Sequence, residues 1–442
     1  MAFTLNDCQS KAVIEITKFL LDPEADEMVL EGYAGTGKTT LIAHYLENFD
    51  KYKQAHEVLG AQFRDFDEIA ITATTRKAAR VLSETMEIEP MTIHAYLKLI
   101  MKNNWSNGTT SLIKSKAAEV LENKLIIIDE ASFIDSSLKG FINLLTMNCK
   151  IIYMGDPAQL ISVNESKSPI FDAGIKTVRL NTIMRNKGTI SKIAKAYRET
   201  VHTGQFKPLI HDGLSVKHVE PDEFEEQIRH VFTHPGFQPE RTAKVLAWTN
   251  NRVSAYNSFI RYCRNVPDHI NEGETLITNK PIMESTSDYI SYSTDVPVTV
   301  KNVEQVNIDG IEGFLVDLEK RKELFVPTER WKVKALLRKF ADAKQWKQYF
   351  HVKDQWGDLR PVYSSTVHKS QGSTYDKVFI DLSDIGSCKN PDDVARLLYV
   401  AVSRASTEVI MCGQLPPEYL GETNNDSAAA KLKGLKETLL ES

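Results

Sequence analysis

The stretch MVLEGYAGTGKTT at residues 28–40 decides the fold of the first part of the chain. It combines an apolar strand with the pattern G-x-x-x-x-G-K-[ST], and a helical pattern follows. In such a loop, glycines let backbone N–H groups turn inward around phosphates at a helix N-terminus. Lys38 would supply a charge to the β- and γ-phosphates, and Thr39 a hydroxyl to Mg²⁺. The flanking strand and helix argue against a chance glycine-rich turn, so the stretch predicts a nucleotide-binding α/β domain.

An acidic pair follows a second apolar run, LIIIDE at residues 125–130. A magnesium site needs a carboxylate at the end of a neighbouring strand, and Asp129 would hold the metal through water. Glu130 would orient and deprotonate the attacking water, which favours hydrolysis over transfer to a protein hydroxyl. The pair alone is a weak signal, but together with the phosphate loop it predicts a nucleoside triphosphatase.

Short apolar runs alternate with helical stretches along most of the chain, as in parallel sheets covered by helices. The first block has strand-like runs at 28–31, 70–72, 125–129 and 150–156. The second block has strand-like runs at 244–248, 377–382 and 408–412, and helical stretches at 190–201, 253–263 and 391–402. The pattern predicts two α/β domains in tandem.

Residues 276–360 interrupt the second block with short, valine-rich segments separated by turns, which predicts a small antiparallel barrel. From Glu329 to Lys353 we expect a helix with eight Lys or Arg and two acidic residues, a local net charge of +6. Tryptophan, tyrosine and phenylalanine are interleaved with these charges. Two interpretations stay open: a solvated amphipathic helix whose aromatic residues pack on the barrel, or a nucleic-acid contact.

The composition limits the classes of protein. The 442 residues correspond to about three domains, and 42% hydrophobic with 26% charged residues is typical of globular proteins. The net charge of −5 shows no bulk positive field and argues against a histone-like coat. Five scattered cysteines predict neither a disulfide framework nor a zinc finger. No signal peptide or membrane span is indicated, so we expect a cytoplasmic protein.

With its further motifs, the sequence resembles the superfamily 1 DNA helicases of the RecD and Dda group. Beyond the phosphate loop and the acidic pair, the resemblance rests on Gln9 in LNDCQSKAV and on motifs in family order. These motifs are TATTRKAA at 72–79, TIHAYL at 92–97, MGDPAQLISV at 154–163, LNTIMRN at 180–186, AWTNNRVSAYN at 247–257, STVHKSQGSTYDKVFID at 365–381 and LLYVAVSRAS at 397–406.

The resemblance implies an α/β fold of two tandem RecA-like P-loop domains, with a β-hairpin insertion in the first and a small SH3-like β-barrel insertion in the second. We place the first domain at 1–186, with its hairpin at about 98–118. The second takes 187–275 and 361–442, and the barrel with a helical arm takes 276–360. The implied activity is Mg-ATP hydrolysis between the two domains, driving 5′ to 3′ movement on single-stranded DNA and duplex unwinding.

The resemblance also assigns roles around the nucleotide. Gln9 would recognise adenine, although a lone glutamine before a helix is usually a surface residue. Gln159 would sense the γ-phosphate, and Arg185 and Arg404 would act as arginine fingers, although either arginine could form a structural ion pair. The catalytic set is completed by Lys38 and Glu130, with Thr39 and Asp129 at the metal. The ATP-binding residues are Gln9, Gly32, Ala34, Gly35, Thr36, Gly37, Lys38, Thr39 and Thr40.

Hydroxyl, imidazole and ammonium groups suit the phosphate contacts of an enzyme that moves along DNA. The DNA-binding residues implied by the resemblance are Thr74, Lys77, Thr92, His94, Thr366, His368 and Lys369. Single histidines are by default packed or surface residues, and only the motif context favours contact for His94 and His368. Asn107-Gly108 predicts a hairpin turn. Trp105 near its tip is a DNA-binding wedge or, alternatively, packs the hairpin onto its own domain.

Other functions stay open at this point. They are a translocase that strips proteins from single strands and unwinds poorly, a nucleotide-gated DNA clamp, and a subunit of a RecD-like nuclease complex. The expected partners are single-stranded and forked duplex DNA, with single-strand-binding protein or replisome components as candidates. The resemblance implies a monomer encoded by a phage and acting in the host bacterial cytoplasm. It leaves DNA replication, DNA recombination and origin remodelling open.

Overall fold

The computed structural model describes residues 4–60, 62–89, 91–162, 165, 168–184, 188–284 and 290–421. Within these residues the chain forms two compact units. The first takes the chain up to Pro157, Ile161–Thr182 and Asn265–Val362. The second takes Ala158–Leu160, Ile183–Arg264 and the chain from Tyr363 onward. The segment that interrupts the second α/β block is therefore counted with the first unit.

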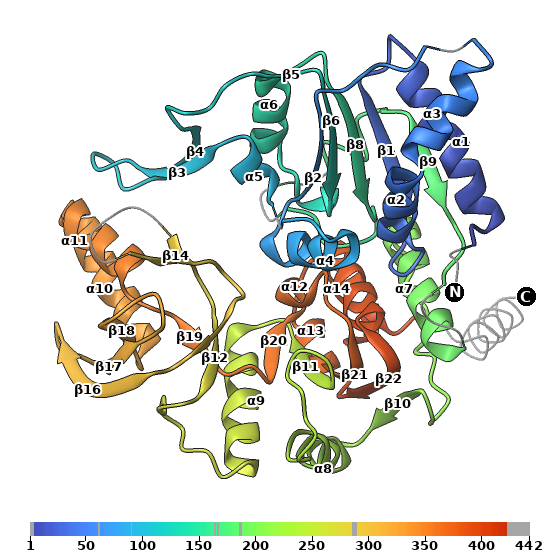
Figure 1. Cartoon of the computed structure of the whole chain (residues 1–442). Coiled ribbons are helices and arrows are strands. Elements are labelled where there is room, and N and C mark those ends of the chain that lie inside the picture. Colours follow the sequence, from blue (N-terminus) through green and yellow to red (C-terminus); the bar gives the residue numbers. More distant parts are fainter. Residues whose placement is uncertain are drawn as a thin grey trace, which may run out of the picture. The chain divides into compact units, whose positions relative to one another are not determined.

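A five-stranded parallel sheet forms the centre of the first unit (Figure 1). In spatial order its strands are β2 (Glu68–Ala73), β6 (Lys124–Asp129), β8 (Lys150–Gly155), β1 (Glu27–Gly32) and β9 (Thr177–Leu180). Its helices are α1 (Asp7–Leu21), α2 (Lys38–Glu47), α3 (Phe49–Glu57), α4 (Arg76–Met86), α5 (Ile93–Tyr96) and α6 (Ser136–Leu145), with the 3-10 turn η1 (Ala131–Phe133). The four predicted strands are confirmed. β9 is an additional edge strand that was not predicted.

Alternate residues of each central strand point into two different cores. In β6, Leu125 and Ile127 join the core that α1, α2 and α4 cover, while Ile126 and Ile128 join the core under α6. Helices on both faces exclude water from the whole strand. This double burial explains why the strands read as continuous apolar runs.

Small strand pairs extend the first unit. The predicted hairpin is confirmed as β3 (Leu99–Asn103) and β4 (Thr110–Lys114), paired antiparallel from Leu99↔Lys114 to Asn103↔Thr110. Gly108 in its turn has φ 73°, which favours glycine. A short parallel pair joins β5 (Leu121–Glu122) to β7 (Thr146–Met147).

The segment between the two α/β blocks folds into antiparallel pairs. Its strands are β12 (Thr275–Thr278), β13 (Ile282–Met283), β14 (Ile290–Tyr292), β15 (Pro297–Thr299), β16 (Asn302–Ile308), β17 (Ile311–Asp317), β18 (Leu324–Pro327) and β19 (Leu359–Arg360). They form the sheets β15-β12-β19, β16-β17-β18 and β13-β14. The antiparallel character that we predicted for this insertion is confirmed.

The prediction of one helix from Glu329 to Lys353 is wrong. The structure has α10 (Arg330–Asp342), α11 (Trp346–Phe350) and a π-helical turn, η2 (His351–Gln355). Lys344 between α10 and α11 adopts φ 54°, a left-handed conformation that ends a helix. We call α10, α11 and η2 together the arm.

The second unit contains another five-stranded parallel sheet. Its strands, in spatial order, are β10 (Val216–Val219), β22 (Ala405–Cys412), β21 (Tyr375–Asp381), β11 (Ala243–Ala247) and β20 (Ser364–Thr366). Its helices are α7 (Thr189–Thr203), α8 (Pro221–Phe232), α9 (Asn250–Cys263), α12 (Val367–Ser370), α13 (Leu382–Gly386) and α14 (Pro391–Ser403), with η3 (Pro417–Tyr419). The predicted tandem α/β arrangement is confirmed.

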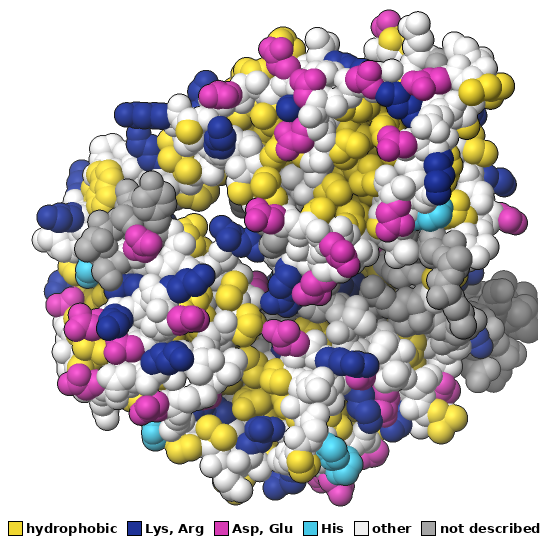
Figure 2. All heavy atoms as spheres, in the orientation of Figure 1, with side chains coloured by type: hydrophobic (Ala, Val, Ile, Leu, Met, Phe, Trp, Pro, Cys, Tyr) yellow, Lys and Arg dark blue, Asp and Glu magenta, His cyan; other side chains and the backbone are white. Residues whose placement is uncertain are grey.

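Acidic and basic side chains are interspersed over the face of the molecule shown in Figure 2. All five cysteines are free thiols. Within the described ranges, no helix combines the length and the apolar character needed to cross a membrane.

We expect Ile127→Ala to destabilise the first unit by about 2–5 kcal/mol, because this central side chain is 0% exposed and its loss leaves a cavity. Ile69→Ala on the edge strand β2 is the matched control, since Ile69 is 37% exposed. Thermal unfolding of the two variants checks the expectation. Equal shifts of the melting temperature would contradict the burial pattern.

Candidate active site

Three neighbouring strands of the first sheet have their carboxyl ends on the same side of the sheet, and the candidate residues follow these strand ends (Figure 1). β1 ends at Gly32, β8 ends at Gly155, and β6 ends at Asp129. Ligands of open parallel sheets bind beyond the carboxyl ends of the strands. The phosphate loop and the acidic pair, 90 residues apart, therefore meet at this edge.

The loop between β1 and α2 requires glycine at particular positions. Gly35 and Gly37 have φ 79° and 80°, in the left-handed region. A Cβ at Gly32 would lie 2.6 Å from Oγ1 of Thr36 and 3.1 Å from Cβ of Leu180. The close turn therefore requires residues without a side chain at positions 32, 35 and 37.

The structure holds the loop in place with two contacts. The Lys38 ammonium donates a hydrogen bond to the Gly32 carbonyl across the loop. The Ala34 N–H donates to the Asp156 carboxylate at 2.9 Å. Asp156 lies in the MGDPAQLISV motif and is not among the predicted site residues. Its place directly after a buried strand, at the same edge as Asp129, is the signal that could have identified it.

The predicted metal ligands lie together. Thr39 Oγ1 donates to Asp129 Oδ2 at 3.4 Å, and Asp129 is only 9% exposed. Burial raises the pKa of the Asp129 carboxyl, while the Lys38 charge and hydrogen bonds from the Glu130 N–H and Thr39 oppose the rise. A buried carboxylate beside a hydroxyl is the oxygen donor set that Mg²⁺ prefers, and a cation would favour its charged form. The residues present thus fit Mg²⁺.

Glu130 is held in an unusual backbone conformation. Its φ of 53° and ψ of 43° lie in the left-handed region, at a cost of about 1–2 kcal/mol for a residue with a side chain. Its N–H donates to Asp129 Oδ1 at 2.7 Å, and its carbonyl accepts from Thr74 Oγ1 at 2.9 Å. These contacts fix the peptide that carries the candidate base, and one of them comes from a residue predicted to bind DNA.

Gln9 is only 2% exposed, so it is not a surface residue, and its side chain lies against the phosphate loop. A Cβ added at Gly37 would lie 3.0 Å from Gln9 Nε2. The Gln9 side chain also completes a capping box at the start of α1, in which Oε1 accepts from the Asn6 N–H at 3.1 Å. The structure thus brings Gln9 and the loop together.

The other DNA candidates of the first unit lie on α4 and at the start of α5. Ala73, next to Thr74 in the chain, forms a parallel bridge to Thr92, which caps α5 by accepting from the Ala95 N–H at 3.2 Å. Lys77 lies in the first turn of α4 and is half-buried. Burial lowers the pKa of His94, so its imidazole is neutral near pH 7 and would contact a phosphate by hydrogen bonding.

The remaining DNA candidates belong to the second unit and share one short segment. Thr366 caps α12 by accepting from the Lys369 N–H at 3.4 Å. Burial also lowers the pKa of His368. The two histidines thus have the same neutral form near pH 7 in similar helical turns.

The predicted nucleotide residues of the second unit have local partners. Arg404 is 3% exposed and donates to the carbonyls of Val400 and Ser373 at 3.1 and 3.2 Å. Gln159 is 4% exposed, and its carbonyl accepts from Arg396 Nη1 at 2.7 Å. Arg185 lies outside the described residues.

The β3–β4 hairpin packs against the arm. The Trp105 ring meets Phe350 edge to face, with centroids 4.9 Å apart, and Trp105 keeps 56% of its surface exposed. Gly108 lies against Trp346, since a Cβ at Gly108 would be 2.1 Å from that ring. Trp105 therefore packs on the inserted arm, which is part of the same compact unit.

Two polar contacts join the base of the hairpin turn to the arm. Asn103 Nδ2 donates to Asp354 Oδ2 at 2.7 Å, and Lys353 Nζ donates to Thr110 Oγ1 at 2.8 Å. Asn103 and Thr110 face each other across the hairpin and share a hydrogen bond of 2.9 Å. Neither Lys353 nor Asp354 is among the predicted site residues, because their partners on the hairpin lie about 250 positions away in the sequence.

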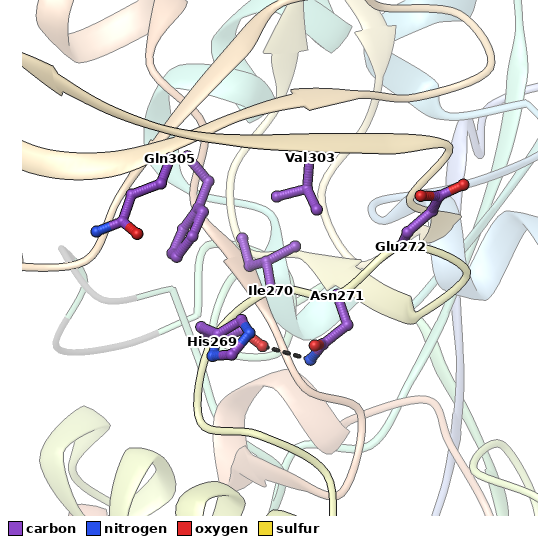
Figure 3. Close-up of a pocket in the computed structure, with 7 residues that line it drawn as sticks. His269, Ile270, Asn271, Glu272, Val303 and Gln305 are labelled. Carbon is purple, nitrogen blue, oxygen red and sulfur yellow. Dashed lines mark hydrogen bonds between the residues drawn. The ribbon is translucent and has the colours of Figure 1, made fainter.

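A separate pocket of about 440 Å³ lies between the insertion and the loop 269–272 that precedes it (Figure 3). Val303 and Gln305 come from β16, while the loop 269–272 forms the opposite wall. Asn271 Nδ2 donates to the His269 carbonyl at 2.6 Å. None of its lining residues belongs to the parallel sheet, so the pocket is distinct from the phosphate loop.

The parallel sheet, phosphate loop and acidic pair define a P-loop nucleoside triphosphatase. Residues 4–213 match the AAA domain family, and residues 361–412 match the UvrD-like helicase C-terminal domain family. The second match begins where the antiparallel insertion ends.

Similar proteins extend over nearly the whole chain. The uncharacterized protein R530 of Acanthamoeba polyphaga mimivirus is 24% identical, covering 85% of this chain and 93% of its own. The ATP-dependent DNA helicase dda of Enterobacteria phage T4 is 23% identical, covering 90% and 97%. A crystal structure of Pif1 helicase from Bacteroides with ADP-AlF3 and ssDNA superposes with a TM-score of 0.50 at 14% identity, covering 99% and 98%. In sequence the chain is similar to the superfamily 1 helicases of the RecD and Dda group, and in fold it is similar to Pif1 helicase.

We expect Glu130→Gln to lower ATP hydrolysis by about 10²-fold or more, because an amide cannot accept the proton of water. Nucleotide binding should persist, since the phosphate loop is unchanged. Steady-state hydrolysis and titration with a fluorescent ATP analogue measure the two properties, with Glu122→Gln on β5 as the control. Hydrolysis at the wild-type rate would contradict the assignment of the base.

Proposed function

We propose that the chain is a DNA helicase that moves 5′ to 3′ along single-stranded DNA and separates duplexes, powered by Mg²⁺-dependent ATP hydrolysis. The observation that carries the proposal is the half-exposed Trp105, anchored on the arm through Phe350 while Asn103 and Thr110 tie the hairpin to the same element. A hairpin held at its tip and stem can resist the force of a duplex driven against it. We propose that it is the pin that splits base pairs.

The residues of the first unit supply the nucleotide chemistry in this proposal. Lys38 exchanges the Gly32 carbonyl for the β- and γ-phosphates, where its charge offsets the charge that develops during transfer. Thr39 and Asp129 hold Mg²⁺, which neutralises phosphate charge when bound. Glu130, fixed by its contacts to Asp129 and Thr74, orients and deprotonates the attacking water.

Gln9 and the rest of the loop complete ATP binding. Its amide Nε2, next to Gly37, is the group that would meet the adenine edge and select ATP over GTP. The rest of the proposed phosphate and nucleoside contacts come from the backbone of Gly32, Ala34, Gly35 and Thr36 and from the side chain of Thr40. Asp156 keeps this backbone in place through the Ala34 N–H.

The second unit is proposed to act on the same nucleotide. Gln159 would sense the γ-phosphate, and Arg185 and Arg404 would act as arginine fingers. For Arg404 this role requires that its guanidinium give up some of the carbonyl contacts that it makes within its own unit. Its charge would then offset the charge that develops on the transferring phosphate.

DNA contact is proposed for the threonine, lysine and histidine residues of both units. The link from Thr74 to the Glu130 carbonyl gives DNA binding a direct route to the catalytic peptide. We propose that a phosphate bound at Thr74 shifts Glu130 into position and stimulates hydrolysis. The insertion, with its antiparallel sheets, is proposed to be the SH3-like barrel of this family.

The alternative functions predict different hairpins and different chemistry. A translocase that unwinds poorly has no use for a hairpin joined to the arm by two polar contacts and a ring pair. A nucleotide-gated clamp with little turnover has no use for a Glu130 held in a costly conformation. Both observations favour the helicase.

We expect a duplex with a 5′ single-stranded tail to be unwound in preference to one with a 3′ tail. A strand-separation assay with ATP and Mg²⁺ measures this preference. Lys38→Ala is the inactive control, because that variant lacks the ammonium group proposed to bind the ATP phosphates. Preference for the 3′ tail, or normal unwinding by the Lys38 variant, would overturn the proposed polarity or the proposed motor.

We expect Trp105→Ala to slow strand separation by about 10-fold while single-strand-stimulated ATP hydrolysis stays within about 2-fold. Loss of one base–aromatic stack of about 1–3 kcal/mol accounts for the size of the effect. Met101→Ala, also exposed on the hairpin but away from its tip, is the matched control. Parallel loss of both activities by Trp105→Ala would show that the tryptophan supports the motor rather than the pin.

A further inference from the structure

The helix α10 has one face that the packing of the insertion does not use. Its apolar side chains Val333, Leu336, Leu337 and Phe340 pack on the core formed by Ile311, Phe325, Val352 and Trp356. At helical spacing on the opposite side lie Trp331, Lys334 and Arg338, all exposed. We call these three residues the outer stripe of α10.

The outer stripe breaks the usual pattern of an amphipathic helix. Trp331 is 67% exposed on the polar side, although a tryptophan of this size normally lies in a core or an interface. The Lys332 ammonium lies 5.5 Å from the centroid of the Trp331 ring. Trp331 belongs to neither of the two apolar clusters described in the insertion. An aromatic face is thus left available to a ligand.

The cations of the stripe are uncompensated. Among the described residues, Lys334 and Arg338 form no hydrogen bond and no ion pair, although acidic residues are frequent in this chain. The other cations of α10's first turn are neutralised, since Arg330 pairs with Asp358 at 3.3 Å and Lys332 with Glu329 at 2.5 Å. Arg330 thus ties the first turn of α10 to the segment before β19, and the exposed cations of the helix that form no ion pair among the described residues lie further along it, at Lys334 and Arg338 of the stripe and at Lys339 beside it.

Unpaired cations beside an exposed aromatic ring suit one class of partner. Single-stranded nucleic acid offers phosphates to the cations and an open base face to the ring. A duplex offers phosphates only, because its bases are stacked on each other. The stripe therefore matches single-stranded DNA better than duplex DNA.

The position of α10 decides which strand it meets. α10 is joined through residues 343–345 to α11, which contacts the hairpin through Trp346 and Phe350. If the hairpin splits the duplex, one strand follows the DNA contacts of the two parallel-sheet units, and the other leaves past the element that holds the hairpin. We propose that the outer stripe of α10 binds this displaced strand and hinders its reannealing. The inference rests on the proposed function of the hairpin.

Photocrosslinking tests the proposal in the full chain. Trp331 is replaced by benzoylphenylalanine, and the protein is held on a forked DNA by a non-hydrolysable ATP analogue. The strand with the 5′ tail and the strand with the 3′ flap carry different fluorophores. Benzoylphenylalanine at Lys320, an exposed cation of the same insertion, is the control. We expect the position-331 adduct on the 3′ flap; an adduct on the 5′-tailed strand or on the duplex, or no adduct above the control, would overturn the proposal.

An affinity measurement tests the same site without a photoreactive group. Wild-type protein should bind the fork about 5-fold or more tighter than the same duplex without its 3′ flap, as one base stack provides. Trp331→Ala and Arg338→Glu should lose this gain, whereas Lys320→Glu should keep it. An unchanged gain in the two stripe variants would overturn the proposal.

The failure of the proposed function would look different. In that case the wild-type chain would show neither single-strand-stimulated ATP hydrolysis nor separation of a 5′-tailed duplex. If both activities are present and the adduct or the affinity gain is absent, only the role of α10 is wrong.

Discussion

The convergence of three buried parallel strands at one sheet edge is the constraint on which the candidate site depends. β6, β8 and β1 end at Asp129, Gly155 and Gly32, and the backbone that follows each strand takes part in the site. Because both faces of these strands are covered by apolar cores, the edge is the place where polar groups reach solvent. Asp156 ties the phosphate loop to β8, and Thr74 ties the Glu130 peptide to β2, so neighbouring strands determine the geometry of the chemistry.

The same unit carries the element that would turn hydrolysis into strand separation. The hairpin is short and has two exposed apolar residues on β3, Ile100 and Met101. Two isolated strands of this length are marginally stable in water, so the contacts with the arm are needed to hold the tip. The aromatic residues of the arm had two open interpretations, packing or nucleic-acid contact; in the structure Phe350 packs against Trp105 and Trp346 lies against Gly108. The exposed cations Lys334 and Arg338 of α10 take no part in these contacts with the hairpin.

Much of the fold could be predicted because buried parallel strands read as uninterrupted apolar runs. β6 and β8 are examples, whereas β9 at the edge, with the sequence Thr177–Leu180, mixes exposed and buried residues and gives no such signal. The loop and acidic pair were predictable because both lie next to strong strands. The contact from Asn103 to Asp354 was not, since no local pattern joins residues 251 positions apart. The break at Lys344 was missed because lysine rarely adopts positive φ.

Strand separation in a single turnover tests most directly whether hydrolysis at this site drives a pin. The protein is bound in advance to a 5′-tailed duplex, and either ATP or a non-hydrolysable ATP analogue is added together with a trap for free protein. We predict that the strands separate only with ATP. Separation to the same extent with the analogue would show that binding alone melts the duplex, and it would contradict a motor that drives DNA against the Trp105 hairpin.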